Sequence, residues 1–276
     1  MSDNGNHHQH HHHGDNHNAS PDAVDALRAE LARSQQQVAD LTAAQEEFLR
    51  AVSHDLRAPL RHVTSYGALV REVLGELSVD VLQSGEVQEA LGFLATMDQS
   101  ARRMGLMLDG LLALVRASRA PLQPEPVALA TAVNRACAAL PSRATGHAVQ
   151  WQVSADLPVV WADPVWLREL LVQLLGNAVK FSARTAQPCV TVAPDAAPPG
   201  AVAFTVQDNG VGFDAARAGT LFGVFQRLHR ENEFEGVGTG LALCRAIAER
   251  HGGSITVTAV PGAGCTVRVQ WPVGPP

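Results

Sequence analysis

The sequence has few aromatic residues, few cysteines, no excess of basic residues and no long hydrophobic run. Aromatic residues make up 5% of its 276 residues, with a single tyrosine. Acidic residues outnumber basic ones by 27 to 21, for a net charge of −6. A chain with this net negative charge has no broad basic surface to neutralise a nucleic-acid backbone. We therefore expect no nucleic-acid partner.

Cysteine is scarce as well. The four cysteines are scattered without the spacing of a zinc site: Cys137, Cys189, Cys244 and Cys265. This usage predicts reduced thiols in a cytoplasmic protein, because disulfides belong to oxidising compartments.

A long hydrophobic run is also missing. The most apolar stretch, Met104–Val115, contains Asp109 and is shorter than the roughly 20 residues that a helix needs to cross a bilayer. We find no signal peptide and expect no membrane insertion. The hydrophobic content of 46% is nevertheless enough for two modest domains with buried cores.

Histidine, in contrast, is concentrated at the start of the chain. Seven of the twelve histidines lie between His7 and His17, among polar residues that offer little to bury. Residues 1–22 are therefore predicted to be a disordered tail. Metal binding is one interpretation, but flexible histidines impose no geometry, so a solvated tail or an expression tag is favoured. We assign no site there.

A heptad pattern predicts a coiled-coil signalling helix over residues 23–50. The a positions are Val24, Leu31, Val38, Gln45 and Val52, and the d positions are Leu27, Ser34, Leu41 and Phe48. Two of these positions are polar, so a surface helix packed within one chain remains the alternative.

Residues 45–118 are predicted to form a helical hairpin. Apolar residues recur every three or four positions to about Leu77, where only Pro59 interrupts the helix, and again over 86–118 after a turn at 78–85. One hairpin has little apolar contact of its own. We therefore expect two copies to form a four-helix bundle, which makes the protein a homodimer.

Three prolines mark residues 119–126 as a stiff linker, and the pattern changes after it. Over 127–274, helical segments alternate with short strand-like runs, which predicts an α/β sandwich. The expected helices are 129–140, 164–181 and 239–251, and the expected strands are 148–154, 189–193, 201–208, 254–259 and 265–271. The predicted fold class is therefore α + α/β, a helical-hairpin dimerisation domain followed by an α/β sandwich.

Four blocks of the second domain stand out: 170–181, 208–213, 221–225 and 236–241. Each alone is weak, because glycine clusters are mostly turns. In this order and spacing they resemble the N, G1, F and G2 boxes of the ATP-binding domain shared by histidine kinases, Hsp90, type II topoisomerases and MutL. The resemblance covers about 45–271.

The residue types in these blocks suit a nucleotide. Asp208 can accept the adenine amino hydrogen while Gly210 and Gly212 let the backbone approach the base. Asn177 offers a neutral oxygen suited to Mg²⁺, and Lys180 shares its helix face. The resemblance implies that Asp208 reads adenine, that Asn177 holds the metal and that Lys180 lies at the phosphates.

Free amides where a helix begins at Thr239 favour a polyphosphate. The segment between Gly212 and Gly236 resembles a mobile ATP lid, with Arg227 as the predicted phosphate contact. One residue departs from the pattern, because Gln173 replaces the usual first Asn of the N box and reaches farther. The predicted ATP-binding residues are Gln173, Asn177, Lys180, Phe181, Asp208, Gly210, Gly212, Arg227, Gly236, Gly238, Thr239, Gly240 and Leu241.

Residues 48–60, Phe-Leu-Arg-Ala-Val-Ser-His-Asp-Leu-Arg-Ala-Pro-Leu, resemble the H box of the HisKA class of histidine kinases. Since Val52 faces the seam, His54 lies about 200° around the helix and points to solvent. Its imidazole has an unprotonated nitrogen near neutral pH, and Asp55 can accept a proton from the other ring nitrogen. The catalytic residues are predicted to be His54 and Asp55.

The resemblance implies the core of a two-component sensor histidine kinase. Such a core uses ATP and Mg²⁺ to phosphorylate His54, then passes the phosphate to an aspartate on the receiver domain of a response regulator. Ala58 stands where the family often has Thr or Asn, which predicts weak or absent phosphatase activity. A receiver-binding scaffold and an ATP-driven clamp of the Hsp90 or MutL type remain alternatives. Neither the input signal, the cognate regulator nor phosphorylation in cis or in trans can be predicted.

Overall fold

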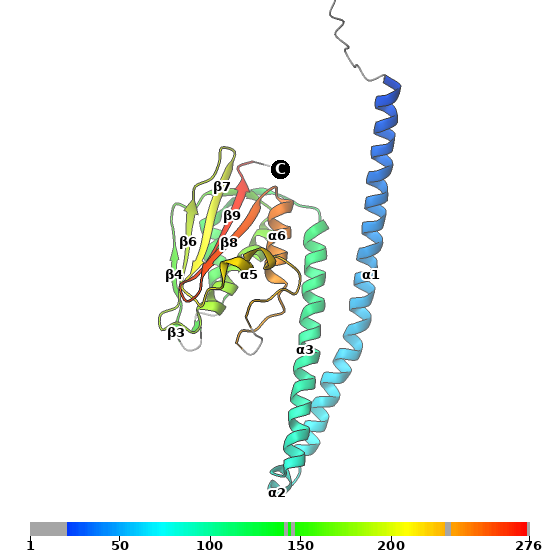
Figure 1. Cartoon of the computed structure of the whole chain (residues 1–276), viewed down its shortest axis with the longest axis vertical. Helices are drawn as coiled ribbons and strands as arrows, with labels where there is room; N and C mark the ends of the chain where they lie inside the picture. The colour runs from blue at the N-terminus through cyan, green and yellow to red at the C-terminus, as the bar shows by residue number, and fades with distance from the viewer. Residues whose placement is uncertain (1–20, 141–142, 145–146, 230–232, 275–276) are drawn as a thin grey trace, which may run out of the picture. The chain divides into compact units, whose positions relative to one another are not determined.

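A computed structural model describes residues 21–140, 143–144, 147–229 and 233–274 of the chain (Figure 1). Most of the predicted His-rich tail lies outside the described residues, although its last two residues already belong to helix α1 (Pro21–Gly75). The chain divides into two compact units, one ending at Leu49 and one beginning at Arg50. No helix of the described residues is both long and apolar enough to cross a membrane.

The first unit consists of the N-terminal part of α1. Apolar side chains at the predicted seam positions of this helix are exposed in the single chain: Leu27, Leu31, Val38, Leu41 and Phe48. Exposed apolar residues at heptad spacing suit a helix that pairs with another helix. The coiled coil itself stays a prediction.

In the second unit, the rest of α1 and helix α3 (Gly85–Arg119) form the hairpin. Helix α1 continues through Pro59 and ends at Gly75. The predicted turn contains a short helix, α2 (Val79–Leu82). Helix α3 begins where Ser84 accepts a hydrogen bond from the Val87 amide at 3.4 Å, an ordinary N-cap arrangement.

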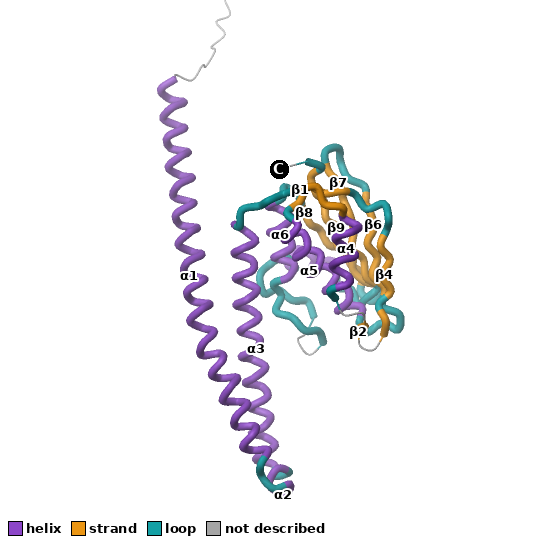
Figure 2. The backbone as a smooth tube through the Cα atoms, turned by 180° about the vertical axis from the view of Figure 1, so that it is seen from behind, coloured by secondary structure: helices purple, strands orange, loops and turns teal. Residues whose placement is uncertain are grey.

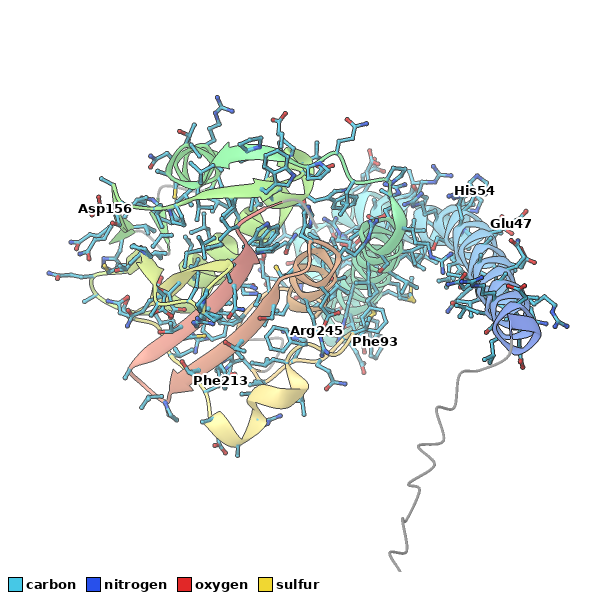
Figure 3. All side chains as sticks on the ribbon, turned by 90° about the horizontal axis from the view of Figure 1, so that it is seen from above. Glu47, His54, Phe93, Asp156, Phe213 and Arg245 are labelled. Carbon is cyan, nitrogen blue, oxygen red and sulfur yellow. The ribbon has the colours of Figure 1, made fainter. Side chains whose placement is uncertain are left out.

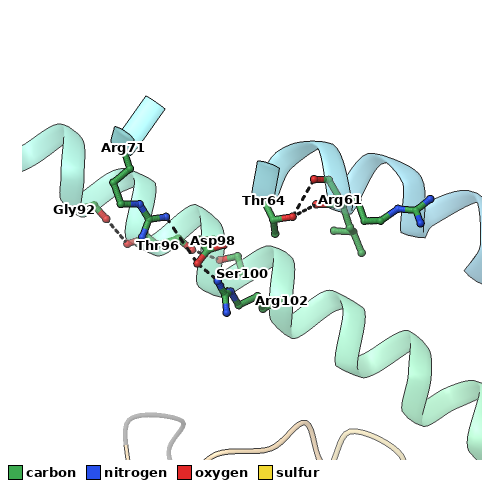
Figure 4. A network of polar contacts seen from close by, with 9 residues as sticks. Arg61, Thr64, Arg71, Gly92, Thr96, Asp98, Ser100 and Arg102 are labelled. Carbon is green, nitrogen blue, oxygen red and sulfur yellow. Dashed lines mark hydrogen bonds and ion pairs between the residues drawn. The ribbon is translucent and has the colours of Figure 1, made fainter. Parts of the chain in front are cut away.

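Ion pairs cross between the two helices of the hairpin. Figure 4 shows Arg71 of α1 reaching Asp98 of α3, with a closest N–O distance of 3.9 Å, while Arg102 contacts the same carboxylate at 3.0 Å. Buried apolar side chains are few by comparison: Ala101, Leu112 and Ala117. Large apolar side chains of the hairpin, such as Leu69, Phe93 and Met97, are exposed in the single chain and suit contact with another copy, so the homodimer stays an expectation.

The C-terminal domain is built on a five-stranded sheet of order β4-β6-β7-β9-β8. Only β4 and β6 are parallel. The strands are β4 (Gln150–Val153), β6 (Cys189–Asp195), β7 (Ala201–Asp208), β8 (Ser254–Val260) and β9 (Gly264–Pro272), with a small separate pair, β2 (Arg143–Ala144) and β3 (His147–Ala148).

Helices cover one face of this sheet (Figure 2). They are α4 (Leu129–Ala138), α5 (Pro164–Ser182) and α6 (Gly240–Arg250). A helical hairpin followed by an α/β sandwich confirms the predicted fold class. All four cysteines are free thiols, as predicted.

The short strand β2 was missed by the sequence analysis, and so were two longer strands that pair with each other. Strand β1 (Glu125–Ala128) pairs antiparallel with β5 (Val159–Ala162) in a separate two-stranded sheet. The last two residues of the predicted linker 119–126, Glu125 and Pro126, are strand residues. Proline is tolerated here because a two-stranded sheet consists of edge strands.

Helix α5 is the centre of the core. Asp163 caps it by accepting from the amides of Val165, at 2.9 Å, and Trp166, at 3.3 Å, and Pro164 occupies the first turn. One face carries fully buried leucines: Leu167, Leu170, Leu171, Leu174 and Leu175. With this face packed into the core, the helix can present its other side to a cavity.

The segment that joins the two domains is tied down. Arg250 of α6 donates to the carbonyls of Ala117, at 3.0 Å, and Ala120, at 2.7 Å. The other carboxylate oxygen of Asp163 accepts from the Gln123 amide at 2.9 Å. The linker is therefore bonded to the domain at several points, where the sequence suggested only stiffness.

Candidate functional site

A cavity of about 460 Å³ lies between α3, α5, the end of β7 and the loop before α6. Twelve of the predicted nucleotide-binding residues line it: Gln173, Asn177, Lys180, Phe181, Asp208, Gly212, Arg227, Gly236, Gly238, Thr239, Gly240 and Leu241. Gly210, the remaining one, supports the floor from behind. Residues more than 60 positions apart in the sequence thus meet in one place.

The floor of the cavity is formed by Asp208, the last residue of β7, which is 6% exposed. Its Oδ1 accepts from the Gly210 amide at 2.8 Å. Burial raises the pKa of Asp208 to about 6, against the lowering effect of backbone hydrogen bonds from Gly210 and Cys265. The carboxylate is therefore an acceptor whose charge is lost just below neutral pH.

Two glycines at this floor cannot be replaced. A Cβ at Gly210 would collide with the carbonyl of Phe181. Gly212 has a positive φ of 58°, and a Cβ there would collide with the carbonyl of Val260. Only glycine lets the backbone pass this close to the cavity.

Helix α5 brings amide and ammonium groups to the cavity. Gln173, Asn177 and Lys180 lie on one side of the leucine face, and Leu174 of that face lines the cavity with them. Burial, assisted by the charge of Arg227 and opposed by Glu235, lowers the pKa of Lys180 to about 8. Lys180 thus remains a cation at neutral pH, at a place where anions would be favoured.

Three rings form a wall that the sequence did not predict. Phe181, His229 and Phe234 pack with ring centroids 5.1 to 5.4 Å apart, and the Lys180 ammonium lies 4.4 Å from the Phe181 centroid. Arg227 donates to the Phe234 carbonyl at 2.7 Å. The predicted lid is folded against the cavity by these contacts, apart from residues 230–232, which lie outside the described part.

Helix α3 also contributes to the cavity, through Leu106, Asp109, Gly110 and Ala113. Gly110 is pressed against Thr239, so a Cβ there would meet all three side-chain heavy atoms of the threonine. No signal in the sequence indicates this contact, because it joins two domains far apart along the chain.

The predicted phospho-acceptor lies elsewhere. His54 and Asp55 are not among the described residues that line the cavity. The His54 side chain is 85% exposed, on the outer surface of α1 (Figure 3). Its Nδ1 lies 3.2 Å from the Asp55 carboxylate. The carboxylate engages this nitrogen and leaves Nε2 for chemistry.

Comparison with known proteins places this site in context. Residues 162–275 match the family described as histidine kinase-, DNA gyrase B-, and HSP90-like ATPase. The chain is 31% identical over 246 residues to Cyanobacterial phytochrome B of Nostoc sp., which covers 89% of the chain and 31% of that protein. It is 29% identical over 232 residues to Methanogenesis regulatory histidine kinase FilI of Methanothrix harundinacea, covering 83% of the chain and 25% of that protein.

A solved structure, full-length ShkA in complex with AMPPNP, is similar with a TM-score of 0.58 and 25% identity. The match covers 83% of this chain and 46% of that one. The chain thus spans about a third or less of the two curated relatives and under half of the solved structure.

Proposed function

We propose, since the chain belongs to the two-component sensor histidine kinases, that it transfers the γ-phosphate of ATP to His54 and then to an aspartate of a response regulator. The protein would act as a homodimer in the cytoplasm. The cavity residues would bind the nucleotide, and the His54–Asp55 pair would accept the phosphoryl group.

The nucleotide is held at both ends. Asp208 accepts the adenine amino hydrogen at the floor of the cavity, and the ring of Phe181 lies beside it. At the other end, Lys180 and Arg227 neutralise the phosphates, and the free amides at the start of α6 bind phosphate oxygens. Such an arrangement positions the γ-phosphate, and no residue of the cavity forms a covalent bond to it.

The donor set also fits Mg²⁺. Asn177 and Gln173 present amide oxygens, which are suitable ligands for a hard cation. Within the described residues no group of three His, Cys, Asp or Glu side chains forms a metal cluster, so phosphate and water oxygens would complete the coordination. When bound, the ion neutralises charge on the transferring phosphoryl group.

His54 receives the phosphoryl group. The Nε2 lone pair attacks the γ-phosphorus, the bond to the β–γ bridging oxygen breaks, and ADP leaves. The imidazole would carry a positive charge after attack, so its Nδ1 proton passes to the Asp55 carboxylate. The product is a phosphoramidate that can transfer its phosphoryl group to an aspartate.

The two sites must come together for this reaction. The cavity does not include His54, so the ATP-binding domain has to move relative to its present contacts with α3. The hydrogen bonds of Arg250 to the carbonyls of Ala117 and Ala120 are among the contacts that such a movement would rearrange.

One observation carries the proposal. A buried Asp208, a cavity-facing Asn177 and a cationic Lys180 meet in one cavity of an ATPase-type domain, in a chain that also holds the exposed His54–Asp55 pair. A receiver-binding scaffold would not need the cavity residues, and a clamp of the Hsp90 or MutL type would not need the exposed His54–Asp55 pair.

Incubation with γ-labelled ATP tests the proposal. We expect the wild-type chain to acquire an acid-labile, base-stable label that is absent from His54→Gln and from Asn177→Ala. Label on His54→Gln at the wild-type level would contradict the assignment. Nucleotide binding without any label on the wild type would favour the scaffold, and ATP turnover without label would favour the clamp.

Ala58 leads to a separate prediction. Because a methyl group cannot orient a water molecule, we expect the chain to dephosphorylate its response regulator weakly or not at all. Ala58→Thr restores a hydroxyl and should increase phosphate release at least severalfold. The measurement is loss of label from the phosphorylated regulator with each variant. Fast release with the wild-type chain would contradict the prediction.

A further inference from the structure

The glutamine that departs from the family pattern has a partner in the structure. Gln173 donates from Nε2 to Oε1 of Glu169 at 2.9 Å, one turn earlier on α5. Glu169, Gln173 and Asn177 follow one another at intervals of four, and all three line the cavity. They form a polar stripe along the face of α5 that the leucines leave free.

This hydrogen bond decides which way the amide points. An ionised carboxylate can only accept hydrogen bonds, so the NH₂ group of Gln173 must face Glu169 and its oxygen must face away. The oxygen is directed at the first residue of α6. A Cβ at Gly240 would lie 2.7 Å from Gln173 Oε1 and 3.9 Å from Asn177 Nδ2. The absence of a side chain at Gly240 leaves room for the oriented amide.

The surroundings of Glu169 support this placement. Burial first, and the charge of Glu169 second, raise the pKa of the Cys244 thiol, which lies on α6. The half-buried Glu169 side chain therefore lies near α6, the helix whose first residue the oriented amide also approaches.

We infer that Glu169 is a positioning residue, which holds the Gln173 amide with its oxygen toward the metal side of the nucleotide. The inference rests on the proposed function. Gln has one more methylene than the Asn usual at this position, and hence one more rotatable bond to restrain. Without the carboxylate, the amide can rotate and turn its NH₂ group toward the cation. An amide NH₂ group has no lone pair available for a cation, so it cannot replace the amide oxygen as a ligand.

A merely structural role predicts something different. An i,i+4 pair on a helix adds little to helix stability. Its loss would leave nucleotide affinity unchanged, or weaken it equally with and without Mg²⁺. An orienting group instead affects the part of the affinity that depends on the cation, and loss of such outer-shell partners typically costs roughly tenfold to a hundredfold.

The experiment measures binding of a fluorescent ADP analogue to the full chain, with Mg²⁺ and with EDTA. We expect Glu169→Ala to weaken binding in Mg²⁺ roughly tenfold or more and to leave binding in EDTA within about twofold. Arg168→Ala, an exposed neighbour on the same helix, is the matched control and should bind like wild type. Glu169→Gln keeps an amide oxygen that can accept from Gln173, so it should retain most of the Mg²⁺-dependent affinity that Glu169→Ala loses.

Coupling to the glutamine is tested in a second background. In Gln173→Asn the shorter side chain does not reach Glu169, so adding Glu169→Ala should change Mg²⁺-dependent affinity by less than about twofold. Equal Mg²⁺ dependence in wild type and Glu169→Ala would overturn the inference, as would equal losses with and without the cation. A wild-type chain that binds no nucleotide would instead overturn the proposed function, so the two failures are distinguishable.

Discussion

At the scale of single residues, Asp208 combines recognition with a cost to the fold. Burial raises the pKa of this carboxyl from 3.8 to about 6, so the folded chain binds the proton more tightly than the unfolded chain does. The penalty of the ionised form therefore develops as the pH rises from about 4 to 6 and is complete above that range. Burial of the ionised Asp208 carboxylate, the proposed adenine acceptor, therefore lowers the free energy of unfolding at neutral pH.

We therefore expect Asp208→Asn to stabilise the nucleotide-free chain at pH 8 by about 1–2 kcal/mol and to abolish ATP binding. The stabilisation should shrink as the pH falls toward 4 and vanish below it, because the folded wild-type carboxyl is neutral at pH 4 and the unfolded one loses its charge below its pKa of 3.8. Urea unfolding of both chains at pH 4.5 and pH 8 checks the expectation. A variant less stable than wild type at pH 8 would contradict it.

At the scale of elements, α5 depends on its first residues. Asp163 accepts from two amides of the first turn and from the Gln123 amide. Because all three donors lose a charged acceptor, we expect Asp163→Ala to destabilise the domain by about 1–2 kcal/mol or more.

Thermal unfolding measures this effect, with Ser84→Ala as the comparison. Ser84 caps α3 with one long hydrogen bond of 3.4 Å, so its removal should cost clearly less. Equal losses of stability in the two variants would show that the hydrogen bonds of Asp163 to the Gln123 amide and to a second amide of α5 do not stabilise the domain.

The elements also show what can be predicted from the sequence. Helix α5 and the glycine-rich loop before α6 were predicted because their cavity-lining residues follow a recognisable order in the sequence. Strand β1 was missed because its proline favoured a linker, and its partner β5 was missed with it, while β2 has only two residues and is too short for an alternating pattern to show. Glu169 was missed because it lies one residue before the block 170–181 on which the resemblance rests, and the contribution of α3 depends on a contact between residues far apart along the chain.

At the scale of the whole molecule, the hairpin closes the cavity from one side. Gly110 of α3 packs against Thr239, which the resemblance assigns to the nucleotide. If the ATP-binding domain must leave this contact to reach His54, the contact restrains the reaction. A methyl group at position 110 cannot fit beside Thr239 unless the two elements separate.

We expect Gly110→Ala to raise the rate of autophosphorylation severalfold by weakening this contact. Gly105→Ala is the matched control, because position 105 lies on the same helix and nothing lies within 4 Å of its added Cβ. Both substitutions increase helix propensity to the same extent. An equal increase in both variants would attribute the effect to the helix instead, and a decrease at position 110 would mean that the contact assists the reaction.

The two faces of α5 are subject to different constraints over evolutionary time. The leucine face is fully buried, so a change there alters packing and threatens the fold as a whole. The polar stripe borders open space, and a change there alters ligand chemistry at small cost to stability. A substitution such as glutamine for asparagine can therefore persist until a neighbour one turn away adapts to it. Helix α5 in this way allows the chemistry of the site to diverge while its architecture stays the same.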